Sequence, residues 1–166
     1  MAHANNISAL SQTKYLRKPP ALLTKTTMYT GIKHLHSTLA YVLLAGLIIS
    51  ILYVLFANLQ NKGYNRKMAL LGLICAHLQF LVGLIIYFVS PYGIKNSAGA
   101  MQDSVARLYF LEHPLMMLIA VILITVGYSR AKRLPTAKKQ NASVLLFYTI
   151  GLVLILSRIP WQAWLQ

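Results

Sequence analysis

Four long apolar runs constrain the fold of this chain more than any other feature. They cover about residues 32–59, 68–89, 105–128 and 143–164. Each run has roughly the 20 residues that a helix needs to cross the hydrocarbon core of a bilayer. Only 11% of the residues are charged, whereas soluble domains average about 25%, so a soluble bundle would lack polar residues for its outward faces. The sequence therefore predicts an all-α integral membrane protein.

The connections between the runs are short, about 60–67, 90–104 and 129–142. Short connections join antiparallel neighbours, so residues 28–166 are expected to form an up-down-up-down four-helix bundle. Small residues within the runs would let the helices approach closely: Gly46, Gly72, Ala76, Gly83 and Gly151.

The positive charge of the chain is concentrated in the first and third connections. The formal net charge is +14, which in a soluble protein would suggest nucleic acid as a partner. Basic and aromatic residues do not interleave outside the runs, however, so we expect a lipid bilayer as the partner and no nucleic acid. The positive-inside rule then places these two connections in the cytoplasm and both termini outside. Their basic residues are Lys62, Arg66, Lys67, Arg130, Lys132, Arg133, Lys138 and Lys139.

Residues 1–27 differ from the rest of the chain because they are polar and basic. They lack the apolar segment of a secretory signal peptide, and Pro19 and Pro20 would interrupt an amphipathic helix. We expect this tail to be disordered. The patterned sequence begins at Tyr29, directly after Met28, and we expect Met28 to be the natural start. A start there would also remove four positive charges from the outer side.

The third run contains the sequence Glu112-His113-Pro114. Ionisable side chains at membrane depth are costly and usually have a functional reason. Pro114 removes one backbone hydrogen bond, so it is expected to kink the helix and open room beside His113. Unpaired opposite charges in the same half of a bilayer would both be costly. Glu112 is therefore expected to pair with Arg158, with Arg107 as the alternative.

Histidines lie in or beside three of the four runs, at His34, His36, His77 and His113. With a rise of 1.5 Å per residue, His36 lies about 6 Å and His113 about 12 Å from the outer face, whereas His77 lies about 20 Å deep. Imidazoles from two helices can hold a haem b iron. We expect His36 and His113 to be the ligand pair, with His77 as the alternative and His34 as a weaker candidate. Arg158 or Lys33 would neutralise a haem propionate near the outer surface.

Two other interpretations of these polar residues remain open. The histidines could hydrogen-bond across helices in a cofactor-free structural or accessory subunit. Alternatively, Glu112 and the histidines could relay protons or admit a small solute. The single cysteine, Cys75, excludes CxxCH, so covalent c-type haem attachment is not expected. The chain has none of the common hydrolase or phosphate-binding motifs, which favours an electron carrier or an accessory subunit over an enzyme.

Several motifs in order resemble a known family. They are Lys33-His34-Leu35-His36-Ser37, Ala76-His77-Leu78-Gln79 with Gly83-Leu84-Ile85-Ile86-Tyr87-Phe88, Glu112-His113-Pro114-Leu115-Met116-Met117 and Ile159-Pro160-Trp161. Over residues 28–164 the chain resembles small four-helix bacterial integral membrane proteins labelled cytochrome b-like. The resemblance implies a multi-pass protein of the bacterial inner membrane that binds haem b and exchanges electrons with a respiratory-chain or other membrane partner.

Overall fold

The structure is a computed structural model that describes residues 20–164. Within this range the protein is all helical, with no strand, and four segments are long and apolar enough to cross a membrane. The predicted fold class, an all-α protein with membrane-spanning helices, is confirmed. The long helices are α2 (Pro20–Leu59), α3 (Arg66–Val89), α5 (His113–Ala131) and α6 (Ala137–Ser157).

Short helical elements lie in the connection from α3 to α5 and after α6. A π-helical turn, η2 (Leu108–Glu112), joins α4 to α5, so that one continuous segment spans Ser104–Ala131. The other short elements are the 3₁₀-helix η1 (Ile94–Asn96), α4 (Ser104–Arg107) and α7 (Trp161–Trp164).

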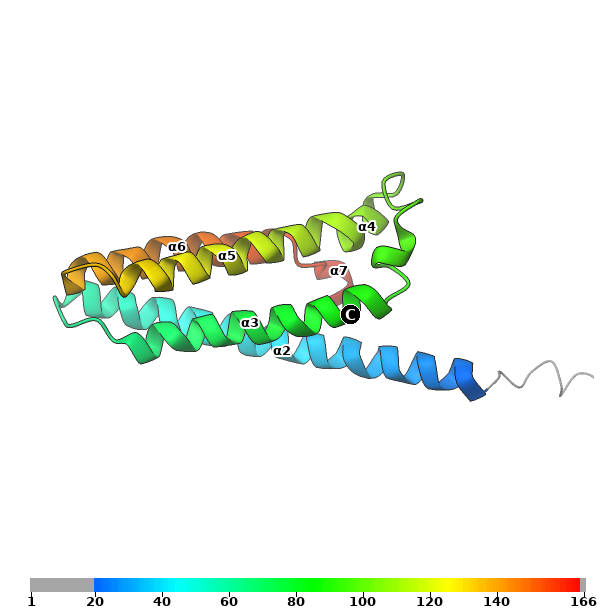
Figure 1. The fold of residues 1–166 in the computed structure, drawn as a ribbon, viewed down its shortest axis with the longest axis horizontal. Helices are drawn as coiled ribbons and strands as arrows, with labels where there is room; N and C mark the ends of the chain where they lie inside the picture. Colours follow the sequence, from blue (N-terminus) through cyan, green and yellow to red (C-terminus); the bar gives the residue numbers. More distant parts are fainter. Residues whose placement is uncertain (1–19, 165–166) are drawn as a thin grey trace, which may run out of the picture.

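Each long helix packs against two others. Helix α2 contacts α3 and α6, and α5 also contacts α3 and α6, so α2 and α5 lie on a diagonal of the bundle. In Figure 1 the α2–α3 and α5–α6 connections lie at one end, and the connection from α3 to α4 lies at the other. The two helix pairs lie close together at the first end and spread apart towards the second.

The buried core has residues from all four long helices, and its tightest packing lies towards the α2–α3 and α5–α6 connections. Tyr148 of α6 is fully buried, and its hydroxyl donates to the carbonyl of Ala69 on α3 at 2.6 Å. A Cβ added at Gly72 would lie only 2.9 Å from the Tyr148 ring, so the close packing here depends on glycine. Leu47 of α2 lies fully buried beside the same site. This packing fixes one end of the bundle.

The first helix begins earlier than the sequence predicted. Helix α2 starts at Pro20 rather than near residue 32, so residues 20–27 are helical and the expected disorder of residues 1–27 is wrong for that part. The reason is that proline has no amide hydrogen to lose in the first turn and its fixed φ suits a helix start. The predicted disorder of residues 1–19 lies outside the described residues.

The last helix is displaced toward the N-terminus from its predicted span of 143–164. Thr136 caps α6 by accepting a hydrogen bond from the Lys139 amide at 3.4 Å. Lysine and glutamine continue a helix as readily as most apolar residues, so the apolar run alone placed its start too late. Pro160 disfavours helical geometry in the residue before it, which accounts for the end of α6 at Ser157.

Candidate functional site

Two histidines from diagonally opposed helices meet inside the bundle. His36 lies on α2, and His113 is the first residue of α5. Their ring centroids are 6.3 Å apart, and the ring planes are inclined by 82°. Both side chains are half-buried. This is the pair that the sequence placed at compatible depths.

Gln79 of α3 holds His36. Its amide nitrogen donates to the His36 backbone carbonyl at 2.9 Å and lies 3.2 Å from the ring Nδ1. A carbonyl oxygen only accepts, so the amide nitrogen must be the atom that faces it. Gln79 is only 8% exposed, and its Oε1 is buried with no hydrogen-bond partner among the described residues. One turn further on, a Cβ at Gly83 would lie 3.1 Å from His36 Cε1, so the glycine leaves space for the ring.

The backbone carbonyl of Arg158 fixes the ring of His113. The Nδ1 atom of His113 lies 2.8 Å from this oxygen. Since the carbonyl only accepts, Nδ1 carries the proton, and in the neutral ring Nε2 keeps its lone pair. Metal-ligating histidines use this same arrangement, in which one nitrogen donates to a carbonyl and the other binds the metal.

The position of Arg158 explains why its backbone carbonyl is free to accept a hydrogen bond from His113. Arg158 follows the last residue of α6, and Pro160 two residues later prevents the helix from continuing. The last carbonyls of a helix have no partner within the helix. His113 therefore satisfies an acceptor that the end of α6 leaves open.

The carboxylate of Glu112 lies between two arginines. Its Oε1 is 2.9 Å from Arg107 Nε, and its Oε2 is 3.5 Å from Arg158 Nε. The pair with Arg158 predicted from the sequence is present, but Arg107 is the closer partner. The three side chains are 30–46% exposed, so solvent screening keeps each pair weak. Two cations around one anion leave a surplus positive charge beside His113.

A π-helical turn, rather than a simple kink, precedes Pro114. The amide of His113 donates to the carbonyl of Leu108, five residues earlier. Pro114 has no amide hydrogen, and in an α-helix its ring would collide with the carbonyl of Phe110. The wider turn relieves this conflict. Single π turns frequently occur at functional sites, where the extra residue changes the direction of nearby side chains.

The other candidate ligands lie apart from this pair. His77 Nδ1 contacts the carbonyl of Leu73 at 2.9 Å, and its Nε2 lies 3.5 Å from the Thr125 hydroxyl. His77 and His34 are both exposed, and in the described part of the chain neither has a hydrogen bond or ring contact with His36 or His113. The structure thus brings together His36, His113, Glu112 and Arg158.

Sequence reasoning did not connect Gln79 to His36 or assign a role to Gly83 in this site. A usable signal exists, because Gln79 and Gly83 are four residues apart and therefore share one face of α3. A polar residue and a glycine on one face of an apolar helix indicate a site where a neighbouring helix approaches with a polar group.

The metal-ligating side chains that meet at this site are the imidazoles of His36 and His113. Among the described residues, no group of three or more histidine, cysteine, aspartate or glutamate side chains converges. A haem iron takes one or two axial ligands from the protein. Two imidazoles joined through one metal by bonds of about 2 Å would have ring centroids roughly 6 Å apart, and the observed separation is 6.3 Å.

No protein-family model, curated protein or solved structure matches this chain. The resemblance to cytochrome b-like membrane proteins therefore stays a prediction that rests on the motifs.

Proposed function

We propose that this integral membrane protein binds haem b between His36 and His113 and carries electrons within the membrane. The observation that supports this most directly is the state of His113. Its Nδ1 is committed to the Arg158 carbonyl, and its ring lies 6.3 Å from a second imidazole. A neutral ring whose Nδ1 proton is held by a carbonyl keeps its Nε2 available to bind a metal.

The residues of this site have distinct roles in the proposal. A bound haem would supply one-electron exchange. His113 would bind the iron through Nε2, and His36 would do so once its ring is released from the Gln79 amide. The surplus charge of Arg107 and Arg158 would attract a propionate. His36 and His113 lie on α2 and α5, so they would hold the group between these two helices.

A cofactor-free structural role is the second candidate. Its supporting observation is that both histidines already have protein partners, Gln79 for His36 and the Arg158 carbonyl for His113. In this case the histidines would link α2 to α3 and α5 to α6. Interhelical hydrogen bonds of this kind contribute about 0.6 kcal/mol on average in membranes.

A reduced-minus-oxidised absorbance spectrum tests the proposal. The full chain, purified from haem-replete cells, is expected to show the α-band of a b-type haem. His36→Ala and His113→Ala should each lose most of this band. His77→Ala is the matched control, because it removes the same side chain from the same bundle, and it should retain the band.

Folding must be measured in the same samples by circular dichroism and size-exclusion chromatography. Folded wild-type protein without an α-band would rule out haem binding and leave the structural role. Loss of the band in His77→Ala but not in His113→Ala would show that the ligands were assigned wrongly.

We also propose a location and an orientation. The arginine-rich and lysine-rich α2–α3 and α5–α6 connections would face the cytoplasm, and the histidine pair would lie in the outer half of a bacterial inner membrane. The electron donor and acceptor would then be membrane components or proteins that reach the outer surface.

A further inference from the structure

The two histidines of the candidate site are held in different ways. His113 donates from Nδ1 to the Arg158 carbonyl at 2.8 Å. Both ring nitrogens of His36, by contrast, lie near the Gln79 amide nitrogen, Nδ1 at 3.2 Å and Nε2 at 3.4 Å. We propose that His113 is a permanent iron ligand and His36 an exchangeable one, whose place on the iron a small uncharged diatomic molecule can take. This inference rests on the haem site proposed above.

The Gln79 amide competes with a metal for the lone pair of His36. A neutral imidazole carries a hydrogen on one nitrogen and a lone pair on the other. Since the amide nitrogen reaches both positions, the lone pair has a donor beside it in either tautomer. His36 can therefore bind an iron only after it gives up this contact. His113 gives up nothing, because the Arg158 carbonyl takes its hydrogen and not its lone pair.

Gln79 is held in the position from which it competes. Its amide nitrogen also donates to the His36 backbone carbonyl at 2.9 Å. A turned amide would present Oε1 to that carbonyl, and an acceptor cannot hydrogen-bond to another acceptor. The side chain is only 8% exposed, so water does not compensate for a lost hydrogen bond. The donor therefore stays beside the ring.

The structure provides a place for a displaced His36 ring. Gly83 has no side chain, and a Cβ there would lie 3.1 Å from His36 Cε1. The ring can thus rest against α3, in contact with Gln79, while His113 keeps the iron. The exchange breaks the bond from the iron to the His36 nitrogen and forms one to the diatomic molecule. The freed lone pair returns to the Gln79 amide, and no electron or proton is gained or lost.

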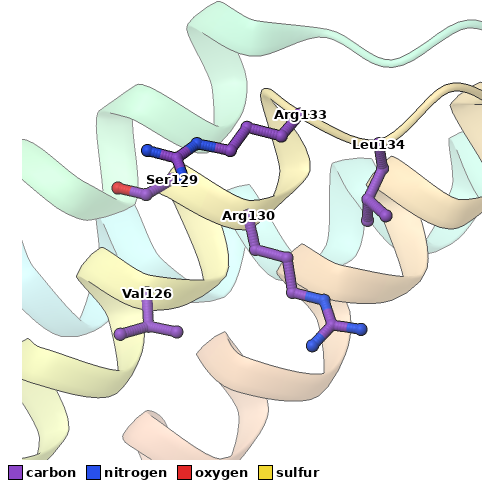
Figure 2. A pocket seen from close by; sticks show the side chains of 5 residues that line it. All are labelled: Val126, Ser129, Arg130, Arg133 and Leu134. Carbon is purple, nitrogen blue, oxygen red and sulfur yellow. The ribbon is translucent and has the colours of Figure 1, made fainter.

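The groove at the opposite end of α5 does not compete for this role. It has a volume of about 300 Å³ (Figure 2). Its lining residues include no histidine, cysteine, methionine or carboxylate, so they offer no ligand to a metal. They are Val126, Ser129, Arg130, Arg133 and Leu134.

A link between helices does not account for all the contacts of Gln79. Its bond to the His36 carbonyl already joins α3 to α2, and any residue at position 36 could supply that carbonyl. The contacts with the two ring nitrogens depend on the imidazole. They act on the atoms that would bind a metal.

Carbon monoxide is the probe that tests this proposal. It is titrated into the reduced, haem-loaded full chain, and the absorbance bands are followed. We expect the wild type to bind carbon monoxide with loss of its α-band. His36→Ala should keep haem, lack the sharp α-band and bind carbon monoxide more tightly, because no side chain competes. Q79L releases His36 to the iron, so its affinity for carbon monoxide should fall about threefold to tenfold, as expected for one interhelical hydrogen bond.

S143A is the matched control. It removes another buried side chain that donates to a backbone carbonyl across helices, from Ser143 to Gly127 at 3.2 Å, at the other end of the bundle. Its affinity for carbon monoxide should equal that of the wild type. Haem-loaded wild type with an α-band that saturating carbon monoxide does not change would overturn the proposal, as would equal affinities in Q79L and S143A. Folded wild type that takes up no haem would instead refute the haem site, and this inference with it.

Nitrogen NMR of histidine-labelled protein without haem tests the Gln79 contact separately. His113 should show the tautomer with its hydrogen on Nδ1. The lone-pair nitrogen of His36 should shift in Q79L and not in S143A, while the His113 signals stay in place. A His36 signal that Q79L leaves unchanged would contradict the competition by Gln79, whatever the haem content of the loaded protein.

Discussion

At the scale of single residues, backbone carbonyls determine how the buried polar side chains are oriented. The His36 carbonyl orients the amide of Gln79, and the Arg158 carbonyl places the proton of His113 on Nδ1. Gln79 Oε1 is left without a donor among the described residues, and a buried acceptor in that state is costly. The site is therefore ordered by contacts that sequence spacing alone does not reveal.

Replacement of Gln79 by leucine should show whether the hydrogen bond or the unpaired oxygen has the larger effect on stability. Q79L removes the link between α3 and α2 and also removes the unpaired oxygen. We expect a net loss of about 0.5–1.5 kcal/mol in unfolding free energy, within the range of interhelical hydrogen bonds in membranes. Denaturation in mixed detergent, followed by circular dichroism, measures it. Q102L, at an exposed residue outside the long helices, is the control and should change stability much less. A Q79L protein more stable than the wild type would mean that the unpaired oxygen outweighs the link.

The two acidic residues, Glu112 and Asp103, allow a comparison of two substitutions that each remove one negative charge. E112Q leaves Arg107 and Arg158 without a counter-charge, and we expect a loss of about 0.5–1 kcal/mol because all three side chains are partly exposed. D103N removes the same charge, but asparagine still caps α4, so its stability should stay close to that of the wild type. The same denaturation experiment measures both variants, and equal losses would show that the Glu112 pairs are not specific.

E112Q also tests the proton-relay interpretation that the sequence left open. A relay through Glu112 needs a carboxyl group that binds and releases a proton. If the protein acts as such a relay, proton flux into proteoliposomes should fall in E112Q and remain in D103N. Unchanged flux in E112Q would exclude Glu112 from the path.

At the scale of elements, the sequence predicted the existence of the helices better than their ends. Apolar runs locate spanning helices because the bilayer sets their length. Helix ends depend on local chemistry that hydropathy ignores, such as Pro20 at the start of α2 and Thr136 as the cap of α6. Depth along the helices indicated that His36 and His113 share one half of the bundle, whereas their meeting and their contacts with Gln79 and the Arg158 carbonyl depend on how the helices are rotated.

Replacement of Pro114 by alanine tests the role of the π turn that precedes it. In P114A residue 114 regains an amide hydrogen, so the turn can tighten to α-helical geometry. We expect a stability equal to or greater than that of the wild type, since proline within a helix costs about 3 kcal/mol. Loss of the extra residue should rotate Glu112 and His113 relative to α6 and weaken the His113–Arg158 contact. The α-band of the haem-loaded protein should therefore shrink while the thermal midpoint does not fall. An unchanged α-band would show that the π turn does not orient His113.

At the scale of the whole molecule, the two ends of the bundle have different chemistry. The end with the α2–α3 and α5–α6 connections holds the fully buried core and most of the basic residues of the described chain. At the other end the helix pairs spread apart (Figure 1), and the elements there carry both acidic residues. From this difference the positive-inside rule predicts a single orientation of the molecule.

Cysteine accessibility in intact cells tests that orientation. In a C75A background, Ser97→Cys lies after η1 at the end with the acidic residues, and Gly63→Cys lies in the α2–α3 connection. Both positions are exposed, and a Cβ added at Gly63 meets no other atom within 4 Å. A membrane-impermeant maleimide should label Ser97→Cys in intact cells and Gly63→Cys only after the membrane is opened. Labelling of both positions in opened cells is the control for reactivity. The reverse pattern in intact cells would place the basic connections outside, and the histidine pair would then lie in the cytoplasmic half of the membrane.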